Sequence, residues 1–199
     1  SSAATSVTAA SLHASTVEAL TAFTAPDAGQ DALRHTMLAF LAARQDACLR
    51  ACEPGHITAS TLVLDHTGSH ALLTLHPRVG AWIQLGGHCE PDDATLLDAA
   101  VREAVEESGV DGVRLHPDPV ALHTHPITCS LGVPTRHLDV RFLGITPPTL
   151  DGTPPPVVRS DESVDLRWWP VDDLPESART AETTQLVDAA RAVHAALVA

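Results

Sequence analysis

The sequence predicts an α/β domain in which helices pack on a mixed β-sheet, with a helical extension before it. Short β-rich segments separated by turn residues run from residue 54 onward, and amphipathic helical segments stand among and after them. A hydrophobic content of 44% over 199 residues allows a buried core. No run of about 18 apolar residues occurs, so no membrane span is expected. We therefore expect an extension over residues 1–53 and an α/β domain over residues 54–199.

Small and apolar residues dominate the N-terminal part. The polar start, residues 1–11, lacks a basic region and is expected to be a loose tail rather than a signal peptide. Helices are predicted at Leu12–Phe23 and Ala32–Leu49, separated by a turn at Asp27–Gly29. Apolar residues recur at helical spacing in the second helix. These helices are expected to cover the domain or to form the contact of a homodimer.

The α/β domain starts with a predicted hairpin and ends with a helix. A short strand that ends in Gly86-Gly87 precedes a predicted helix. We expect this helix to end before Gly109, because glycine is favoured just after a helix C-terminus. The expected elements are strands Ile57–Asp65, Ala71–Leu75 and Ala81–Leu85, helix Thr95–Ser108, paired strands Leu122–Cys129 and His137–Ile145, strand Val164–Trp169, and helix Thr180–Val198.

The composition limits the kinds of molecule that the protein is expected to bind. The formal net charge is −13, which disfavours binding to nucleic acid and to anionic membranes. A bound divalent cation can still invert the local field for a small phosphorylated ligand. Four cysteines in a chain of this length are expected to be thiols in a reducing cytoplasm rather than a disulfide framework: Cys48, Cys52, Cys89 and Cys129.

Three glutamates on the predicted helix before Gly109 carry the chemistry. Glu103, Glu106 and Glu107 stand at i, i+3 and i+4 and so share one sector of the helix. The apolar residues Leu97, Val101, Ala104 and Val105 are expected to face the sheet instead. Clustered carboxylates repel each other, and a hard cation such as Mg²⁺ or Mn²⁺ relieves that repulsion. The alternative, a solvated acidic face, is weakened by the neighbouring Arg102 and Gly86-Gly87, which suit a metal–phosphate site.

The segment from Gly87 to Val110 resembles the Nudix box. That pattern is Gly, five residues, Glu, seven residues, then Arg-Glu-apolar-any-Glu-Glu-any-Gly-apolar, and Arg102–Val110 matches its second part, with Ala104 as the apolar residue. The box glutamate is replaced by Asp93, and eight residues rather than seven precede Arg102. In the family this acid braces the loop, often through the box arginine; the extra residue leaves open whether Asp93 pairs with Arg102.

The resemblance implies an α/β/α sandwich, with residues 54–199 as the catalytic domain. It also implies a hydrolase that uses Mg²⁺ or Mn²⁺ to cleave a phosphoric anhydride bond in a nucleotide-like substrate, a nucleoside diphosphate linked to another moiety. Glu103, Glu106, Glu107 and the carbonyl of Gly87 would bind metal, and Arg102 would orient the glutamates. The proton acceptor would be Glu103 or Glu107, or an acid of a later loop, for which Asp161 and Glu162 are candidates.

The substrate is less well marked. Gly86, His88, Arg78, His125 and His137 are expected to line its pocket, and Trp82, Trp168 or Trp169 to stack a base. Pro126, 16 residues beyond the box, resembles a marker of ADP-ribose-type substrates. An alternative groups His123 and His125 with Cys129 around zinc. Two other functions remain open: a non-catalytic sensor with this fold, and an isomerase with this fold that would use Cys89.

Overall fold

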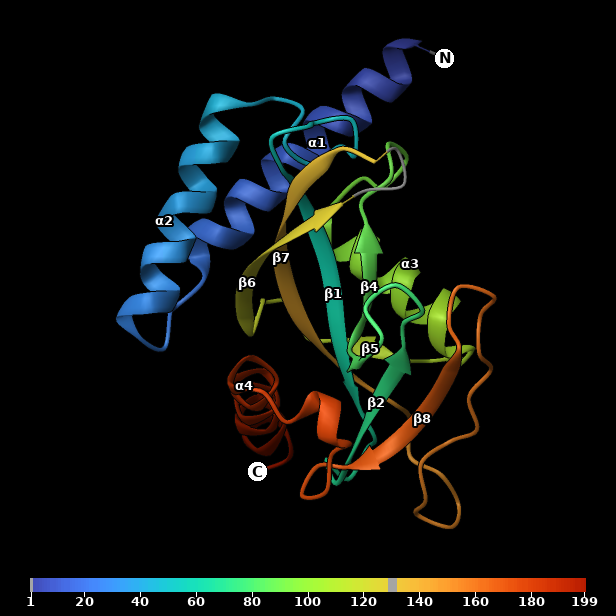
Figure 1. The fold of residues 1–199 in the computed structure, drawn as a ribbon. Helices are drawn as coiled ribbons and strands as arrows, with labels where there is room; N and C mark the ends of the chain where they lie inside the picture. The colour runs from blue at the N-terminus through green and yellow to red at the C-terminus, as the bar shows by residue number, and fades with distance from the viewer. Residues whose placement is uncertain (1, 129–131) are drawn as a thin grey trace.

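The protein folds around one mixed β-sheet. The computed structural model describes residues 2–128 and 132–199. Over these residues the sheet has eight strands, in the order β3-β2-β1-β7-β5, with β4 also on β1, β6 on β7 and β8 on β2 (Figure 1). The elements are α1 (Ser2–Ala22), α2 (Ala28–Ala43), β1 (His56–Leu64), β2 (His70–Leu75), β3 (Trp82–Ile83), β4 (Leu85–His88), α3 (Leu96–Ser108), β5 (Arg114–Leu115), β6 (Ala121–Thr128), β7 (Pro134–Ile145), β8 (Asp165–Pro170), the 3₁₀ turn η1 (Glu176–Ala178) and α4 (Ala181–Val198).

Strand β1 forms the centre of the sheet and is buried along its whole length. It pairs in parallel with β7, from His56 beside His137 to Leu64 beside Ile145. On its other side it pairs antiparallel with β4 and with β2. These pairings give the predicted mixed α/β sandwich with an N-terminal helical extension.

The two faces of β1 have different neighbours because successive side chains point to opposite sides of a strand. Ile57 and Ala59 belong to the apolar cluster that α1, α2 and α3 complete. Leu62 and Leu64 belong to a second cluster, covered by α4. Thr58 and Ser60 lie on the same face as Leu62 and Leu64, so that face is polar at one end and apolar at the other.

Helix α3 has a cap at each end. The hydroxyl of Thr95 accepts a hydrogen bond from Asp98 N, and Gly109 ends the helix with a left-handed φ of 63°. Helix α1 also supports the start of α3, because Ser15 Oγ accepts from Leu96 N at 2.9 Å. The predicted bounds of this helix are confirmed to within one residue.

The extension differs from its prediction in four respects. The second helix begins at Ala28, inside the predicted turn, rather than at Ala32. The expected loose tail is part of α1, which begins at Ser2. The second helix ends at Ala43 rather than Leu49, because Arg44 takes an extended conformation and pairs with Asp46 at 2.8 Å in the next turn. Cys48 and Cys52 therefore reach the interior from turns and do not share a helix. The short strand β5 was not predicted.

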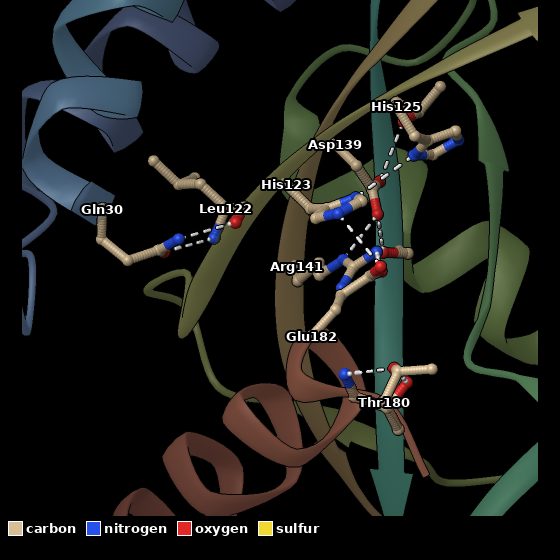
Figure 2. A network of polar contacts seen from close by, with 11 residues as sticks. Gln30, Leu122, His123, His125, Asp139, Arg141, Thr180 and Glu182 are labelled. Atoms are coloured by element: carbon tan, nitrogen blue, oxygen red, sulfur yellow. Dashed lines mark hydrogen bonds and ion pairs between the residues drawn. The ribbon is translucent and has the colours of Figure 1, made fainter. Parts of the chain in front are cut away.

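The extension packs onto the sheet rather than standing apart from it. Leu12 of α1 with Met37 and Leu41 of α2 joins the core cluster on the α3 side. The side chain of Gln30 accepts from Leu122 N at 2.8 Å and donates to Leu122 O at 2.9 Å (Figure 2). These contacts show a cover for the sheet. No described helix is long and apolar enough to cross a membrane.

Candidate active site

Strand β4 presents two glycines directly to the glutamates of α3. Gly86 N donates to Glu107 Oε2 at 3.0 Å. A Cβ added to Gly87 would stand 2.8 Å from Glu103 Oε1, and one added to Gly86 would stand 2.4 Å from the Cβ of Ser60. Gly86 therefore needs to be glycine for β4 to lie this close to β1, whereas a side chain at Gly87 would displace the carboxylate of Glu103.

Helix α3 is turned differently from the prediction. Its buried residues are Leu96, Ala99, Ala100, Ala104 and Ser108, whereas Val101 and Val105 are exposed. The small alanines allow α3 to approach the sheet closely, and Glu103 and Glu107 then flank this buried face. The side chain of Glu106 points outward and is 58% exposed, against 13% for Glu103.

Arg102 organises the loop before α3. Its guanidinium donates to both carboxylate oxygens of Asp93, at 3.0 and 2.9 Å, and to the carbonyl of His88 at 3.0 Å. The same group contacts Glu103 Oε1 at 3.1 Å and Glu106 Oε2 at 3.4 Å. One arginine thus connects β4, the loop and two of the predicted metal ligands.

The open question about Asp93 is answered in favour of pairing. A turn from Glu90 to Asp93 takes up the extra residue: Asp93 N donates to Glu90 O at 3.0 Å and Glu90 N donates to Asp93 Oδ2 at 2.8 Å. The shorter aspartate is consequently 7% exposed and reaches Arg102 with two hydrogen bonds. Asp93 fills the bracing role that glutamate has in the box.

The carboxylates of the site are crowded. Burial raises the pKa of Glu107 to about 7, and the charges of Glu103, Glu162 and Glu106 add to the rise, while the hydrogen bond from Gly86 N opposes it. Burial also raises the pKa of Glu103, against the effect of Arg102. Negative charge is thus concentrated where β4 meets α3.

The donor set suits a hard divalent cation. The contacts with Arg102 and Gly86 use one oxygen of each glutamate, and the second oxygen has no hydrogen bond or ion pair within the described ranges. The three carboxylates do not already converge, since the group of potential ligands that lies close together among the described residues is made of histidines. Glu107 lies at Gly86 and Glu103 at Gly87, and carboxylate and carbonyl oxygens are the ligands that Mg²⁺ and Mn²⁺ prefer.

The remaining predicted residues lie in several parts of the fold. Arg78 is exposed in the turn between β2 and β3, and the structure shows no contact between it and α3 within the ranges it describes. Asp161 and Glu162 are exposed in the turn before β8, and the charge of Glu162 reaches Glu103 and Glu107. The rings of Trp82 and Trp169 pack edge to face, with their centroids 5.1 Å apart. Trp168 Nε1 donates a hydrogen bond to the carbonyl of Pro155.

The predicted pocket histidines lie on the polar end of the sheet face that α4 covers. The pairing registers place His88, His125 and His137 on one face with Thr58 and Asp139. Asp139 accepts from Thr58 at 2.9 Å, from Ser60 at 2.7 Å and from Arg141 at 2.8 Å. The structure thus brings together three of the residues expected to line the pocket.

Helix α4 closes one side of this polar end. Glu182 accepts from Arg141 at 2.5 Å and contacts His123 at 3.0 Å (Figure 2). These interactions hold the pKa of Glu182 down at about 2, chiefly through the hydrogen bond from His123. Two of the three residues of the predicted zinc alternative can be described. The ring centroids of His123 and His125 are 5.4 Å apart in a stacked arrangement, and Cys129 lies outside the described residues.

Sequence reasoning missed four residues of this face. Asp139, Arg141 and Glu182 were not expected to form a network, and His56 was not expected among the pocket histidines. A signal was present in the polar residues at every second position, 56, 58 and 60 in β1 and 137, 139 and 141 in β7. Only the parallel register of the two strands shows that they are neighbours.

Comparison with known proteins agrees with this architecture. The family model described as NUDIX domain matches residues 54–189. The fold is similar to that of C. elegans Ap4A hydrolase, with a TM-score of 0.52 and 23% identity over 70% of this chain and 98% of the other. It is also similar to the NUDIX domain of Shewanella oneidensis NrtR complexed with ADP ribose (0.51, 17%, covering 69% and 86%).

E. coli dihydroneopterin triphosphate pyrophosphohydrolase gives a TM-score of 0.51 at 20% identity, over 66% of this chain and 92% of the other. A comparison with curated proteins gives no significant match. The chain belongs to the NUDIX family. With its box intact at Arg102, Glu103, Glu106 and Glu107, it is a Nudix hydrolase, the class of enzyme that acts on pyrophosphate bonds.

Proposed function

We propose that the protein is a Mg²⁺- or Mn²⁺-dependent pyrophosphohydrolase that cleaves a nucleoside diphosphate linked to another moiety. The observation that supports this most strongly is the contact of Glu103 and Glu107 with the Gly86-Gly87 backbone. Arg102 braces that contact through Asp93 and the carbonyl of His88. A sensor that only binds a ligand has no need for this complete carboxylate set.

In this proposal Glu103, Glu106, Glu107 and the carbonyl of Gly87 hold the ion. When bound, the ion neutralises charge on the diphosphate and makes water a better nucleophile. Arg102 fixes the position of Glu103 and Glu106 by its hydrogen bonds. The proton acceptor is one of Glu103, Glu107, Asp161 and Glu162, and Glu162 is the later-loop acid whose charge reaches the site.

The polar end of the sheet supplies the substrate pocket of this proposal. Gly86, His88, His125 and His137 line it, and Gly86 connects it to the carboxylates through its hydrogen bond to Glu107. Arg78, in the same proposal, is exposed in the turn between β2 and β3. Two structures of similar fold are described with Ap4A hydrolysis and with bound ADP ribose. Because the identities are only 23% and 17%, these two compounds belong in a test panel and are not assigned as substrates. Pro126, 16 residues beyond the box, supports including ADP-ribose in that panel.

The proposal includes a small-molecule partner and a cytoplasmic location, with neither nucleic acid nor membrane as partner. A net charge of −13 supports the exclusions, because phosphate backbones and anionic lipids would be repelled. A homodimer remains one alternative for the extension. The isomerase alternative loses its support, because Cys89 is 3% exposed within the apolar cluster and burial raises its pKa.

The test is product release from a panel of nucleoside diphosphate and triphosphate derivatives, with Mg²⁺, with Mn²⁺ and with chelator. A coupled phosphatase reveals products that end in a phosphomonoester. Metal-dependent cleavage of a few linked diphosphates is the expected result, and the best of them defines the substrate class. Absence of cleavage across the panel, together with ligand-induced thermal stabilisation by one compound, would replace the hydrolase with the sensor.

A further inference from the structure

Three histidines from three strands converge at the end of the sheet next to β4. His56 begins β1, His88 ends β4 and His137 lies in β7. One ring nitrogen of each lies within 4.8 Å of the other two. We propose that His56, His88 and His137 form a Zn²⁺ site, separate from the glutamates of the Nudix box.

The arrangement of the rings is that of three ligands around a common centre. All three pairs of ring centroids are 5.0 Å apart, so the rings form an equilateral triangle. Imidazole nitrogens bound to tetrahedral zinc at about 2.0–2.1 Å would lie about 3.3 Å from one another. The nitrogens lie within 4.8 Å of one another, so they would need to close by up to about 1.5 Å to bind one zinc ion.

The nitrogens also lack any other partner. The Nε2 atoms of His56, His88 and His137 are all buried without a hydrogen bond among the described residues. His56 is 1% exposed, so its unpaired Nε2 is far from water. A buried polar atom without a partner costs free energy, and a cation shared by the three rings would give these atoms a partner.

The tautomer of His56 is suited to a ligand. Its Nδ1 lies 3.2 Å from the carbonyl of Cys52, which can only accept, so the ring donates there and Nε2 carries the lone pair. A carbonyl in this position is the usual support of a metal-bound histidine, because it fixes the ring orientation.

The donor type decides which ion is bound. Three imidazole nitrogens favour zinc and similar late transition metals, whereas Mg²⁺ and Mn²⁺ prefer oxygen. The two sites share β4 but point apart: the His88 carbonyl binds Arg102 on the box side, and the His88 ring joins His56 and His137. Bound zinc would join β1, β4 and β7, and through the Cys52 turn it would also join the extension to the sheet.

The experiment uses the full chain, stripped with chelator and then given one equivalent of Zn²⁺ or Co²⁺. Retention of about one zinc per chain after desalting is expected, with a melting temperature raised by about 5 °C or more. Co²⁺ should give the intense visible absorption of a tetrahedral centre. His137→Gln should lose the retained zinc and the absorption, while His35→Gln, on the exposed face of α2, should keep both.

Two further variants keep the test decisive. If His137→Gln does not fold, His88→Gln tests the same triangle from the shorter strand β4. Glu107→Gln should retain zinc, since its carboxylate belongs to the other site. Wild-type protein that keeps no zinc and shows no cobalt absorption would overturn the proposal, as would zinc that is lost in Glu107→Gln but kept in His137→Gln. These outcomes are independent of whether the chain hydrolyses any substrate.

Discussion

The two ends of strand β4 offer different chemistry from nearly the same place. At Gly86 and Gly87 the strand meets carboxylates, all of which come from α3 within five consecutive residues. At His88 it meets imidazoles that come from β1 and β7, far apart in the sequence. The first set is hard and charged; the second is neutral and of intermediate softness. One short strand can therefore serve two ions without competition between them.

The carboxylates and the imidazoles also differ in the structural features that position them. The carboxylates are positioned by helical periodicity and by glycines that allow close approach, so local sequence is enough to recognise them. The imidazoles are positioned by strand register, and a shift of β7 against β1 by one residue would move His137 to the opposite face. The comparison predicts that the two sets fail separately when they are mutated.

The largest effect is expected for Glu107→Gln. Turnover should fall by roughly a hundredfold or more, because the carboxylate charge that holds the ion is lost. Gln can still accept the hydrogen bond from Gly86 N, so the melting temperature should change little. Asp98→Asn, an exposed position at the start of the same helix, is the matched control and should keep its rate. A Glu107→Gln variant with near-normal turnover would remove Glu107 from the site.

A smaller loss is expected for Asp93→Asn. It removes the carboxylate that accepts two hydrogen bonds from Arg102, so turnover should fall about tenfold and the free energy of unfolding by about 1–3 kcal/mol. Asp93→Glu keeps the charge and has the residue type of the box, so its turnover should be higher than that of Asp93→Asn. Steady-state kinetics and chemical denaturation measure both quantities, and unchanged kinetics in Asp93→Asn would show that the brace is dispensable.

The separation of the two donor sets is tested by measuring both stabilisation by zinc and Mg²⁺-dependent turnover in a variant of each set. His56→Gln should lose the stabilisation by zinc and keep most of the Mg²⁺-dependent turnover, whereas Glu107→Gln should do the reverse. Turnover in His56→Gln within a few-fold of wild type is expected, because this ring belongs neither to the carboxylates nor to the proposed substrate pocket. Loss of both properties in both variants would mean that the two sets form one site.

The smallest effect concerns Glu182, which joins α4 to the polar end of the sheet. Its pKa is about 2 in the folded protein and about 4.5 when unfolded, so its stabilising effect is present above pH 4.5 and disappears as the pH falls toward 2. Glu182→Gln should lower the melting temperature by about 1–3 °C at pH 7, because the pair is partly exposed. The difference from wild type should shrink in acid; a constant difference would show that charge is not its cause.

Much of the α/β domain was predictable because its signals are local. The caps Thr95 and Gly109 define α3, and the hairpin of β1 and β2 follows from alternation around a turn. Periodicity failed where small residues decide the packing: Ala99, Ala100 and Ala104 let α3 lie close to the sheet, so Val101 and Val105 face outward. In the extension, the Arg44–Asp46 pair ended a helix that the apolar pattern extended.

The site was predictable to the extent that it lies in the box. The structure brings Arg102, Glu103 and Glu107 to the same place beside β4, and their role in catalysis stays a prediction. The turn at Glu90 allows Asp93 to reach Arg102, which counting residues could not establish. His56 and Asp139 were beyond reach, because the parallel pairing of β1 with β7 connects distant parts of the sequence. A pairing of this kind is fixed by the whole sheet rather than by either strand.

The amide of Gln30 has a consequence beyond joining α2 to the sheet. It occupies both backbone hydrogen-bonding groups of Leu122 as a neighbouring strand would. Strand β6 pairs with β7 alone among the described strands, so its other side is where an extended chain from a second molecule could add. Because Gln30 already occupies the outward N–H and C=O of Leu122, an added chain could not pair with β6 at this residue without displacing α2.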